Sequence, residues 1–258
     1  MGKLKNLPDG IRLLNSIRVF NRSIPEIDKA RASGNPQLER QTIAHYTELW
    51  ARNVADMFHM DIIVEGTENI PAEDGFVFIS NHQGYADIIA LLIAAPGRQI
   101  GFVAKDSLAK VPYIGQWISR IRGMFISRGD AKAALRTIQE GAKTVKNGFN
   151  LIIFPEGTRS RGPQMGAFKP GSFKLATKAK APIVPVAISG SYHVYEEKGY
   201  AQPATIRVSI LPPVNTAELS RHEITEAEKS VEQSIRQELV RLTRMDEQEK
   251  NDVNDHDK

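Results

Sequence analysis

The sequence FVFISNHQGYADIIALLIA, residues 76–94, joins two apolar runs through a short polar turn. Its first five residues are aromatic, β-branched or small and predict a buried strand at 76–80. The second apolar run begins just after Gly84 and predicts a helix at 85–95. A strand that passes directly into a helix is the repeating unit of α/β folds.

The same alternation continues on both sides of this stretch. Strands are expected at 61–64, 76–80, 100–104, 124–127, 151–154, 183–188 and 205–211. Helices are expected at 85–95, 111–120, 131–147, 171–178 and 217–243. Together they predict one α/β domain at 59–244, with a mixed, mostly parallel sheet covered by helices on both faces.

The two ends of the chain differ from this domain. Apolar residues at helical spacing predict helices at 10–22 and 36–58, which form an N-terminal helical hairpin within residues 1–58. The acidic, polar segment 245–258 is expected to be disordered.

The first expected helix is both basic and apolar. Residues 1–24 hold five basic residues and one acid, and Ile11, Leu14, Ile17 and Phe20 lie at helical spacing. A basic amphipathic helix of this kind is expected to dock on an anionic membrane surface. The alternative is that the helix packs against its own domain and that the apolar stripe is internal.

Composition narrows the possible functions. Hydrophobic residues make up 41% of the 258 residues, enough for a core, and the absence of cysteine excludes disulfides, thiol catalysis and cysteine metal sites. The net charge is only +4, but residues 98–180 contain sixteen Lys or Arg against four Asp or Glu, a local charge of +12. Such a region suits phosphate, phospholipid or nucleic acid. A nucleic-acid partner is not expected, because no recognisable binding module is present.

Residues 81–87, Asn-His-Gln-Gly-Tyr-Ala-Asp, carry the first candidate site. On a continuous helix, His82 and Asp87 would point away from each other, because a helix has 3.6 residues per turn. At a strand-to-helix turn, which Gly84 makes easier, Asp87 can fold back to the imidazole. The pair would then be a general base with its orienting carboxylate. A chance pairing of a turn residue with a helix-start charge is the open alternative, and a metal site is a weaker one.

Residues 154–160, Phe-Pro-Glu-Gly-Thr-Arg-Ser, also follow an apolar strand. Glycine beside hydroxyl residues lets backbone N–H groups approach an anion, and the fork of Arg159 suits phosphate oxygens. Glu156 cannot bind a phosphate directly, so it is expected to fix Arg159 or to accept from a substrate hydroxyl. An exposed loop with a surface ion pair is the alternative.

Two further segments complete a pattern. Residues 123–128, Gly-Met-Phe-Ile-Ser-Arg, end a strand with an arginine, and residues 183–188, Ile-Val-Pro-Val-Ala-Ile, place a proline within an apolar strand. In this order the four segments resemble the four motifs of the glycerolipid acyltransferase family, the PlsC-like 1-acyl-sn-glycerol-3-phosphate acyltransferases. The resemblance covers about residues 61–210 and includes the intervening KDSL, PYIG and FKPG segments.

The resemblance implies a reaction and a site. A PlsC-like enzyme transfers a fatty acyl group from an acyl thioester, acyl-CoA or acyl-carrier protein, to the sn-2 hydroxyl of lysophosphatidic acid, giving phosphatidic acid. His82 would be the general base and Asp87 its orienting carboxylate. The acceptor site would be formed by Lys105, Arg128, Glu156, Gly157, Thr158 and Arg159. No metal and no cofactor beyond the acyl thioester is implied.

Other readings differ in acceptor or in activity. The acceptor could be glycerol-3-phosphate or another lysolipid, and a catalytically inactive phospholipid-binding protein is a different class, which the presence of both His82 and Asp87 argues against. No apolar run approaches the roughly 20 residues of a spanning helix. The protein is therefore expected on the cytoplasmic face of the cell membrane as a peripheral or monotopic protein.

Overall fold

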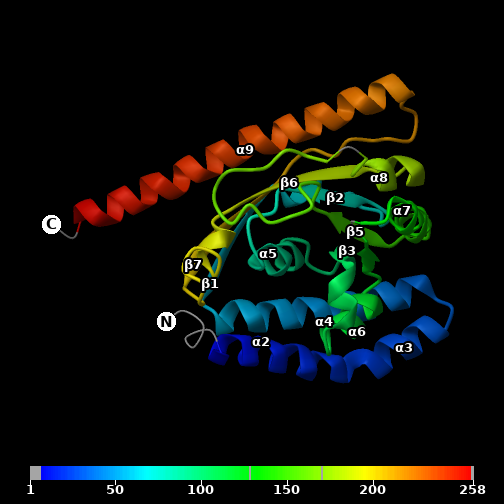
Figure 1. Cartoon of the computed structure of the whole chain (residues 1–258), viewed down its shortest axis with the longest axis horizontal. Coiled ribbons are helices and arrows are strands. Elements are labelled where there is room, and N and C mark those ends of the chain that lie inside the picture. Colours follow the sequence, from blue (N-terminus) through cyan, green and yellow to red (C-terminus); the bar gives the residue numbers. More distant parts are fainter. Residues whose placement is uncertain (1–6, 128, 170, 257–258) are drawn as a thin grey trace.

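The computed structural model describes residues 7–127, 129–169 and 171–256 and contains a seven-stranded sheet at its centre (Figure 1). The strands are ordered β1-β7-β6-β2-β5-β3-β4, and all neighbours are parallel except the antiparallel pair β6 and β7. The strands are β1 (Met60–Glu65), β2 (Val77–Ser80), β3 (Ile100–Lys105), β4 (Met124–Ile126), β5 (Asn150–Ile153), β6 (Ile183–Ser189) and β7 (Ala204–Ile210). The prediction of a mixed, mostly parallel sheet is confirmed.

The helices cover both faces of the sheet, as predicted. They are α2 (Leu7–Phe20), α3 (Ile24–Ala32), α4 (Pro36–Met57), α5 (Ala86–Ala94), α6 (Ile114–Arg120), α7 (Ala131–Lys146), α8 (Lys174–Ala179) and α9 (Arg221–His256). Figure 1 shows α9 running across one face, while α5 lies between the other face and the N-terminal helices α2, α3 and α4. The two apolar cores follow this division: Phe78 packs with α4 and α5, and its neighbour Val77 packs with α7, α8 and α9.

Three predicted helices begin three or four residues later than expected. Tyr113 has a positive φ of 65°, so α6 starts at Ile114, and Gly171 has a φ of 84°, so α8 starts at Lys174. Before α9, the Ser220 side chain accepts from the backbone N–H of Glu223 at 3.4 Å, which places the start of the helix there. Local backbone features therefore delayed the start of these three helices, whereas the apolar pattern had indicated the right segments.

The acidic segment 245–258 was expected to be disordered, and that prediction was wrong as far as His256, because α9 continues to this residue. Asp246 explains why the helix extends past Thr243. Its carboxylate accepts from the Ser189 hydroxyl at 2.6 Å and from the Arg207 guanidinium at 2.8 Å, and Arg207 is itself buried on β7. The sequence had suggested that Asp246 would face solvent, but its side chain contacts the sheet.

The N-terminal helices attach to the domain through aromatic rings. The rings of Phe20, Trp50 and Trp117 lie 4.6–6.2 Å apart, and they join α2, α4 and α6. Ile17 and Phe20, which were expected on the membrane-facing stripe, are buried and pack in this core. The internal alternative is therefore correct for these two residues, while Ile11 and Leu14 remain 50% and 38% exposed.

Within the described part of the chain, none of the helices combines the length and the apolar composition needed to cross a bilayer. The sequence had led to the same expectation.

Glu39 joins the N-terminal helices to the turn after α6. Its side chain is 4% exposed and accepts from Arg31 at 2.7 Å and from Arg122 at 2.6 and 2.7 Å. Burial by itself would raise the pKa of the Glu39 carboxyl, but the hydrogen bonds from Arg122 and Arg31 hold this pKa below its usual value. The interaction links residues 83 positions apart and stabilises the charged carboxylate.

We expect Glu39→Ala to lower the free energy of unfolding by about 3 kcal/mol, because it leaves two arginines facing an apolar gap. This loss of stability lies at the low end of the range for breaking a buried ion pair, because the side chains of Arg31 and Arg122 both reach solvent. Urea denaturation measures it. Glu140→Ala, which removes an exposed pair with Lys143, is the matched control and should cost about 0–1 kcal/mol. Equal losses in the two variants would contradict the structural role of Glu39.

Candidate active site

His82 and Asp87 meet at the turn between β2 and α5. The Nδ1 atom of His82 lies 2.6 Å from Oδ2 of Asp87, which confirms the predicted strand-to-helix geometry. Asp87 lies in the first turn of α5, and the N–H of Gly84 donates to the same oxygen at 3.0 Å. Because α5 starts only at Ala86, the chain between the two residues is free to fold back.

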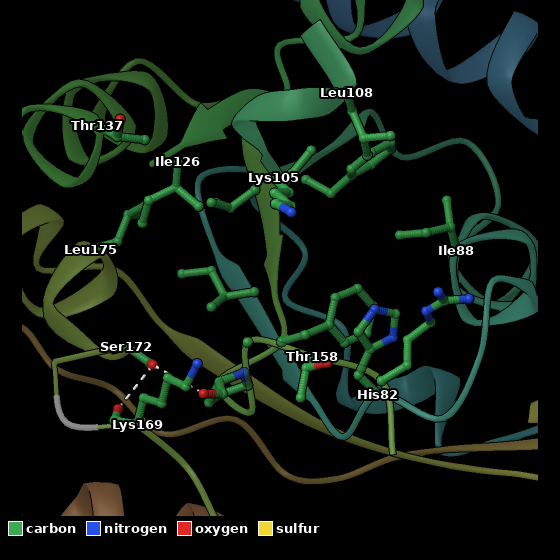
Figure 2. A pocket seen from close by; sticks show the side chains of 18 of the residues that line it. His82, Ile88, Lys105, Leu108, Ile126, Thr137, Thr158, Lys169, Ser172 and Leu175 are labelled. Atoms are coloured by element: carbon green, nitrogen blue, oxygen red, sulfur yellow. Dashed lines mark hydrogen bonds between the residues drawn. The ribbon is translucent and has the colours of Figure 1, made fainter. Parts of the chain in front are cut away.

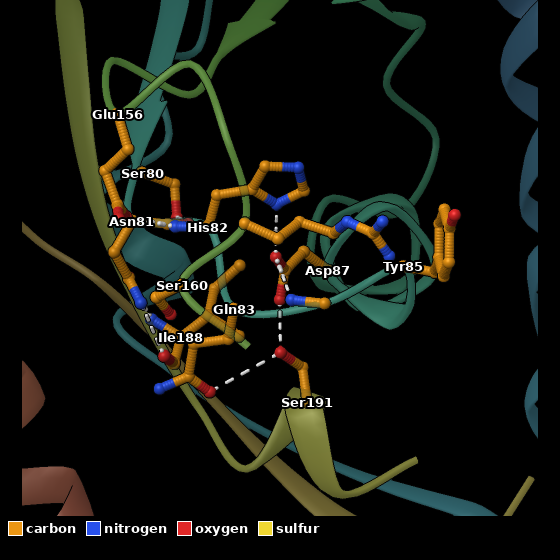
Figure 3. Close-up of polar contacts among 12 residues, drawn as sticks. Ser80, Asn81, His82, Gln83, Tyr85, Asp87, Glu156, Ser160, Ile188 and Ser191 are labelled. Carbon is orange, nitrogen blue, oxygen red and sulfur yellow. Dashed lines mark hydrogen bonds and ion pairs between the residues drawn. The ribbon is translucent and has the colours of Figure 1, made fainter. Parts of the chain in front are cut away.

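Ser191 binds the other carboxylate oxygen of Asp87. The hydroxyl of Ser191 donates to Oδ1 of Asp87, and both side chains are buried (Figure 3). An Nδ1–H of His82 that donates to this fixed carboxylate leaves Nε2 as the hydrogen-bond acceptor of the imidazole. The His82 ring stacks on Phe154, with centroids 4.0 Å apart and planes 16° from parallel. The imidazole is therefore fixed in both tautomer and orientation.

The loop 154–161 lies directly against the His82 turn. The N–H groups of Ser160 and Arg161 donate to the carbonyls of His82 and Gln83 at 2.7 and 3.1 Å. The two candidate motifs, which lie about 75 residues apart in the sequence, thus form a single backbone unit. They meet because they follow β2 and β5, which are parallel neighbours in the sheet.

Glu156 strengthens the same unit. Its carboxylate accepts from the N–H of His82 at 2.7 Å and from the N–H of Gly166 at 2.8 Å. Burial raises the pKa of this carboxyl above its ordinary value, and the two N–H groups oppose the rise. The expectation that Glu156 fixes Arg159 was wrong. The carboxylate is 4% exposed and binds backbone N–H groups, because the loop 154–161 turns it toward the end of β2, where His82 lies.

Arg159 has a different acidic partner. Its Nη1 donates to Glu196 at 2.6 Å, and its guanidinium carbon lies 3.5 Å from the centroid of the Tyr85 ring. Glu196 follows β6 and lies 37 residues after Arg159 in the sequence. Arg159 is 19% exposed and lines the pocket described next.

A pocket of about 490 Å³ opens beside His82. Three of the expected site residues lie with His82 at its polar end, Gly157, Thr158 and Arg159, and a fourth, Lys105, lies farther from the imidazole in the same lining. Lys169, which was not among the predicted site residues, adds a further cation. Arg128 lies outside the described residues. Cationic groups and the imidazole therefore surround one end of the same space.

The other end of the pocket is apolar. Figure 2 shows Ile126, Thr137 and Leu175 grouped away from His82, with Lys105 between them and the imidazole. These side chains come from β4, α7 and α8, so the apolar arm lies where the helices cover the sheet. A pocket with one cationic and one apolar end fits an amphipathic molecule with an anionic head.

Ser191, Tyr85 and Glu196 were missed by the sequence analysis. Ser191 lies 104 residues after Asp87, and Glu196 lies 37 residues after Arg159 and 111 after Tyr85, so no local spacing signals these contacts. The only sequence signal was their position after the apolar strand at 183–188, since loops that follow neighbouring parallel strands share one edge of the sheet.

Comparisons with known proteins identify the family of the chain. The family model described as Acyltransferase matches residues 61–189, which is half of the chain. The 1-acyl-sn-glycerol-3-phosphate acyltransferase of Saccharomyces cerevisiae is 37% identical over 185 residues, covering 69% of this chain and 60% of that protein. A chloroplast enzyme of the same name from Brassica napus is 31% identical over 180 residues, covering 68% and 51%. The chain thus spans only about half to three-fifths of the length of these relatives.

A solved structure extends the likeness to the N-terminal helices. The crystal structure of the 1-acyl-sn-glycerophosphate acyltransferase PlsC from Thermotoga maritima is 27% identical, with a TM-score of 0.72. The match covers 94% of this chain and 98% of that one. The fold, the paired His82 and Asp87 and the family match lead to one conclusion: the chain belongs to the acyltransferase family.

Proposed function

We propose that the protein acylates the sn-2 hydroxyl of lysophosphatidic acid, with acyl-CoA or acyl-carrier protein as donor, and so forms phosphatidic acid. One observation carries the proposal: an imidazole oriented by Asp87 faces a pocket that is cationic at one end and apolar at the other. The relatives named as 1-acyl-sn-glycerol-3-phosphate acyltransferases support the same substrate class.

The reaction needs one general base. Nε2 of His82 takes the proton of the acceptor hydroxyl while its oxygen attacks the thioester carbonyl, so an O–C bond forms and the C–S bond breaks. The imidazolium that results is stabilised by Asp87 and returns its proton to the leaving thiolate. This acyl transfer consumes the acyl thioester and requires no other cofactor.

The acceptor would bind with its phosphate at the cationic end. Arg159 offers a planar set of donors, and Lys105 and Lys169 add positive charge from β3 and from the loop before α8. Arg128 belongs to the same proposal on the basis of the sequence motif. An acyl chain then occupies the apolar arm near Ile126 and Leu175, because chain burial there removes apolar surface from water.

The exposed side of α2 would hold the enzyme on an anionic membrane surface at the cytoplasmic face. Ile11 and Val19 are 50% and 56% exposed, and the basic Arg18 and Arg22 are exposed near them. The amide of Asn21 donates to the carbonyl of Tyr113 at 3.2 Å, which ties the end of α2 to the segment that follows the pocket wall at Leu108. Attachment through α2 would therefore bring the membrane toward the segment beside the pocket.

We expect His82→Ala to lower kcat by about 10²- to 10⁴-fold, because the general base is lost. The fold should persist, since the ring is partly exposed in a turn. Acyl transfer to lysophosphatidic acid is measured with both donors. His222→Ala changes a histidine that is 82% exposed and should leave transfer unchanged. Turnover close to the wild-type value in His82→Ala would show that another group is the base.

Arg159→Ala should raise the KM for lysophosphatidic acid far more than the KM for the donor, because only the acceptor carries the phosphate next to the reacting hydroxyl. Arg159→Lys should recover part of the loss, since it keeps the charge but not the planar fork. Steady-state kinetics with glycerol-3-phosphate as a second acceptor tests the acceptor class. Equal damage to both KM values would point to a structural role.

The double variant Ile11→Asp, Val19→Asp should lose binding to anionic liposomes in a co-sedimentation assay, because it places charge in the apolar contact. The control Leu135→Asp, Val240→Asp changes two side chains of similar exposure, 45% and 47%, on α7 and α9. Binding of the wild-type chain should weaken as salt rises, because part of the attraction is screened charge. Equal binding by the two double variants would place the membrane contact elsewhere.

A further inference from the structure

Glu196 lies beside the pocket but belongs to neither of the two main motifs. It follows the 3-10 turn Ser191–His193 after β6, and its side chain is 3% exposed. A buried acid next to a cluster of cations that would bind phosphate requires a physical explanation, because it opposes the charge that the ligand needs.

The contacts of Glu196 supply one. Its Oε1 accepts from Nη1 of Arg159 at 2.6 Å and from the backbone N–H of Tyr85 at 2.9 Å. The Tyr85 ring covers one face of the same guanidinium, with the central carbon 3.5 Å from the ring centroid. Glu196 thus binds one edge of the Arg159 guanidinium, and the Tyr85 ring packs on one of its faces. Within the described part of the chain, the Arg159 guanidinium makes one hydrogen bond, to Glu196, so its other N–H groups are available to a ligand.

The space for the Glu196 carboxylate depends on Gly84. A Cβ atom at position 84 would lie 2.5 Å from Oε2 of Glu196 and 3.1 Å from the carbonyl of Ser191. The glycine between His82 and Asp87 therefore does more than allow a turn. It lets the carboxylate approach the backbone of the His82 loop closely.

The second carboxylate oxygen of Glu196, Oε2, is buried and differs from the first in having no hydrogen-bond partner among the described residues. Burial also raises the pKa of this carboxyl above its usual value, and Arg159 and the Tyr85 N–H oppose the rise. An unsatisfied buried oxygen is costly, and local conflicts of this kind concentrate at functional sites.

We propose that Glu196 is a positioning residue for the acceptor. It fixes the guanidinium of Arg159 so that the remaining N–H groups meet the acceptor phosphate. Through the Tyr85 N–H it also ties that arginine to the start of α5, the helix that carries Asp87. The phosphate and the general base are thereby held at a set separation. This role rests on the proposed function, in which Arg159 binds the phosphate.

Glu196→Ala should raise the KM for lysophosphatidic acid roughly 10- to 100-fold, the range for loss of one hydrogen bond to a charged group. The KM for the donor should stay near the wild-type value. Glu196→Gln keeps an oxygen that accepts from Arg159 and from Tyr85, so it should recover most of the loss. Glu197→Ala, an exposed acid of the same segment that pairs with His193, is the matched control and should behave as the wild type.

A double-mutant cycle separates positioning from general damage. If Glu196 acts through Arg159, the variant Glu196→Ala, Arg159→Ala should have the acceptor KM of Arg159→Ala alone. Thermal denaturation of each variant identifies any loss of fold, and Glu196→Gln then carries the test. An unchanged acceptor KM in Glu196→Ala, or effects that add in full in the double variant, would overturn the role.

Calorimetric binding of a short-chain lysophosphatidic acid distinguishes failure of this inference from failure of the proposed reaction. A wild type that binds the lipid but transfers no acyl group overturns the reaction, and weaker binding by Glu196→Ala still supports the role of Glu196. Equal binding by the wild type and Glu196→Ala overturns the role whatever the turnover. A wild type that does not bind the lipid overturns both.

Discussion

The carboxylate of Glu156 accepts from the N–H of His82 and from the N–H of Gly166, and the geometry of the site depends on this interaction. It joins two loops that leave β2 and β5 at the same edge of the sheet. With the two backbone hydrogen bonds to the carbonyls of His82 and Gln83, it makes one unit of the imidazole loop and the loop that carries Arg159. A buried carboxylate is stable there because both oxygens meet N–H donors.

A third loop completes the site from the other side of β2. The strand order places β6 beside β2, so the segment after β6 reaches the same edge. Ser191 from this segment holds Asp87, and Glu196 holds Arg159. Each chemically important side chain is thus supported by a residue from a different strand end, which fixes its orientation far better than a single loop can. The arrangement follows the general rule that ligands bind at the carboxyl ends of parallel strands.

The N-terminal helices show how one amphipathic segment divides its apolar residues. Phe20 of α2 packs against Trp50 and Trp117 and Ile17 is buried in the same core, whereas Ile11 remains half exposed. The buried part holds the helix on the domain, and the exposed part leaves apolar area beside arginine side chains. Packing on the protein and contact with a lipid surface are therefore compatible, since they use different faces of one helix.

The sequence by itself determined the class of fold, the order of strands and helices along the chain and the meeting of His82 with Asp87. Apolar periodicity is a local property, and a five-residue spacing at a strand-to-helix turn allows few geometries. Only the tertiary structure decided that Glu156 binds backbone N–H groups, that Glu196 pairs with Arg159 and that Asp246 of α9 pairs with Arg207 of the sheet. These partners lie 37 to 74 residues apart, and the sheet order, not the local sequence, brings them together.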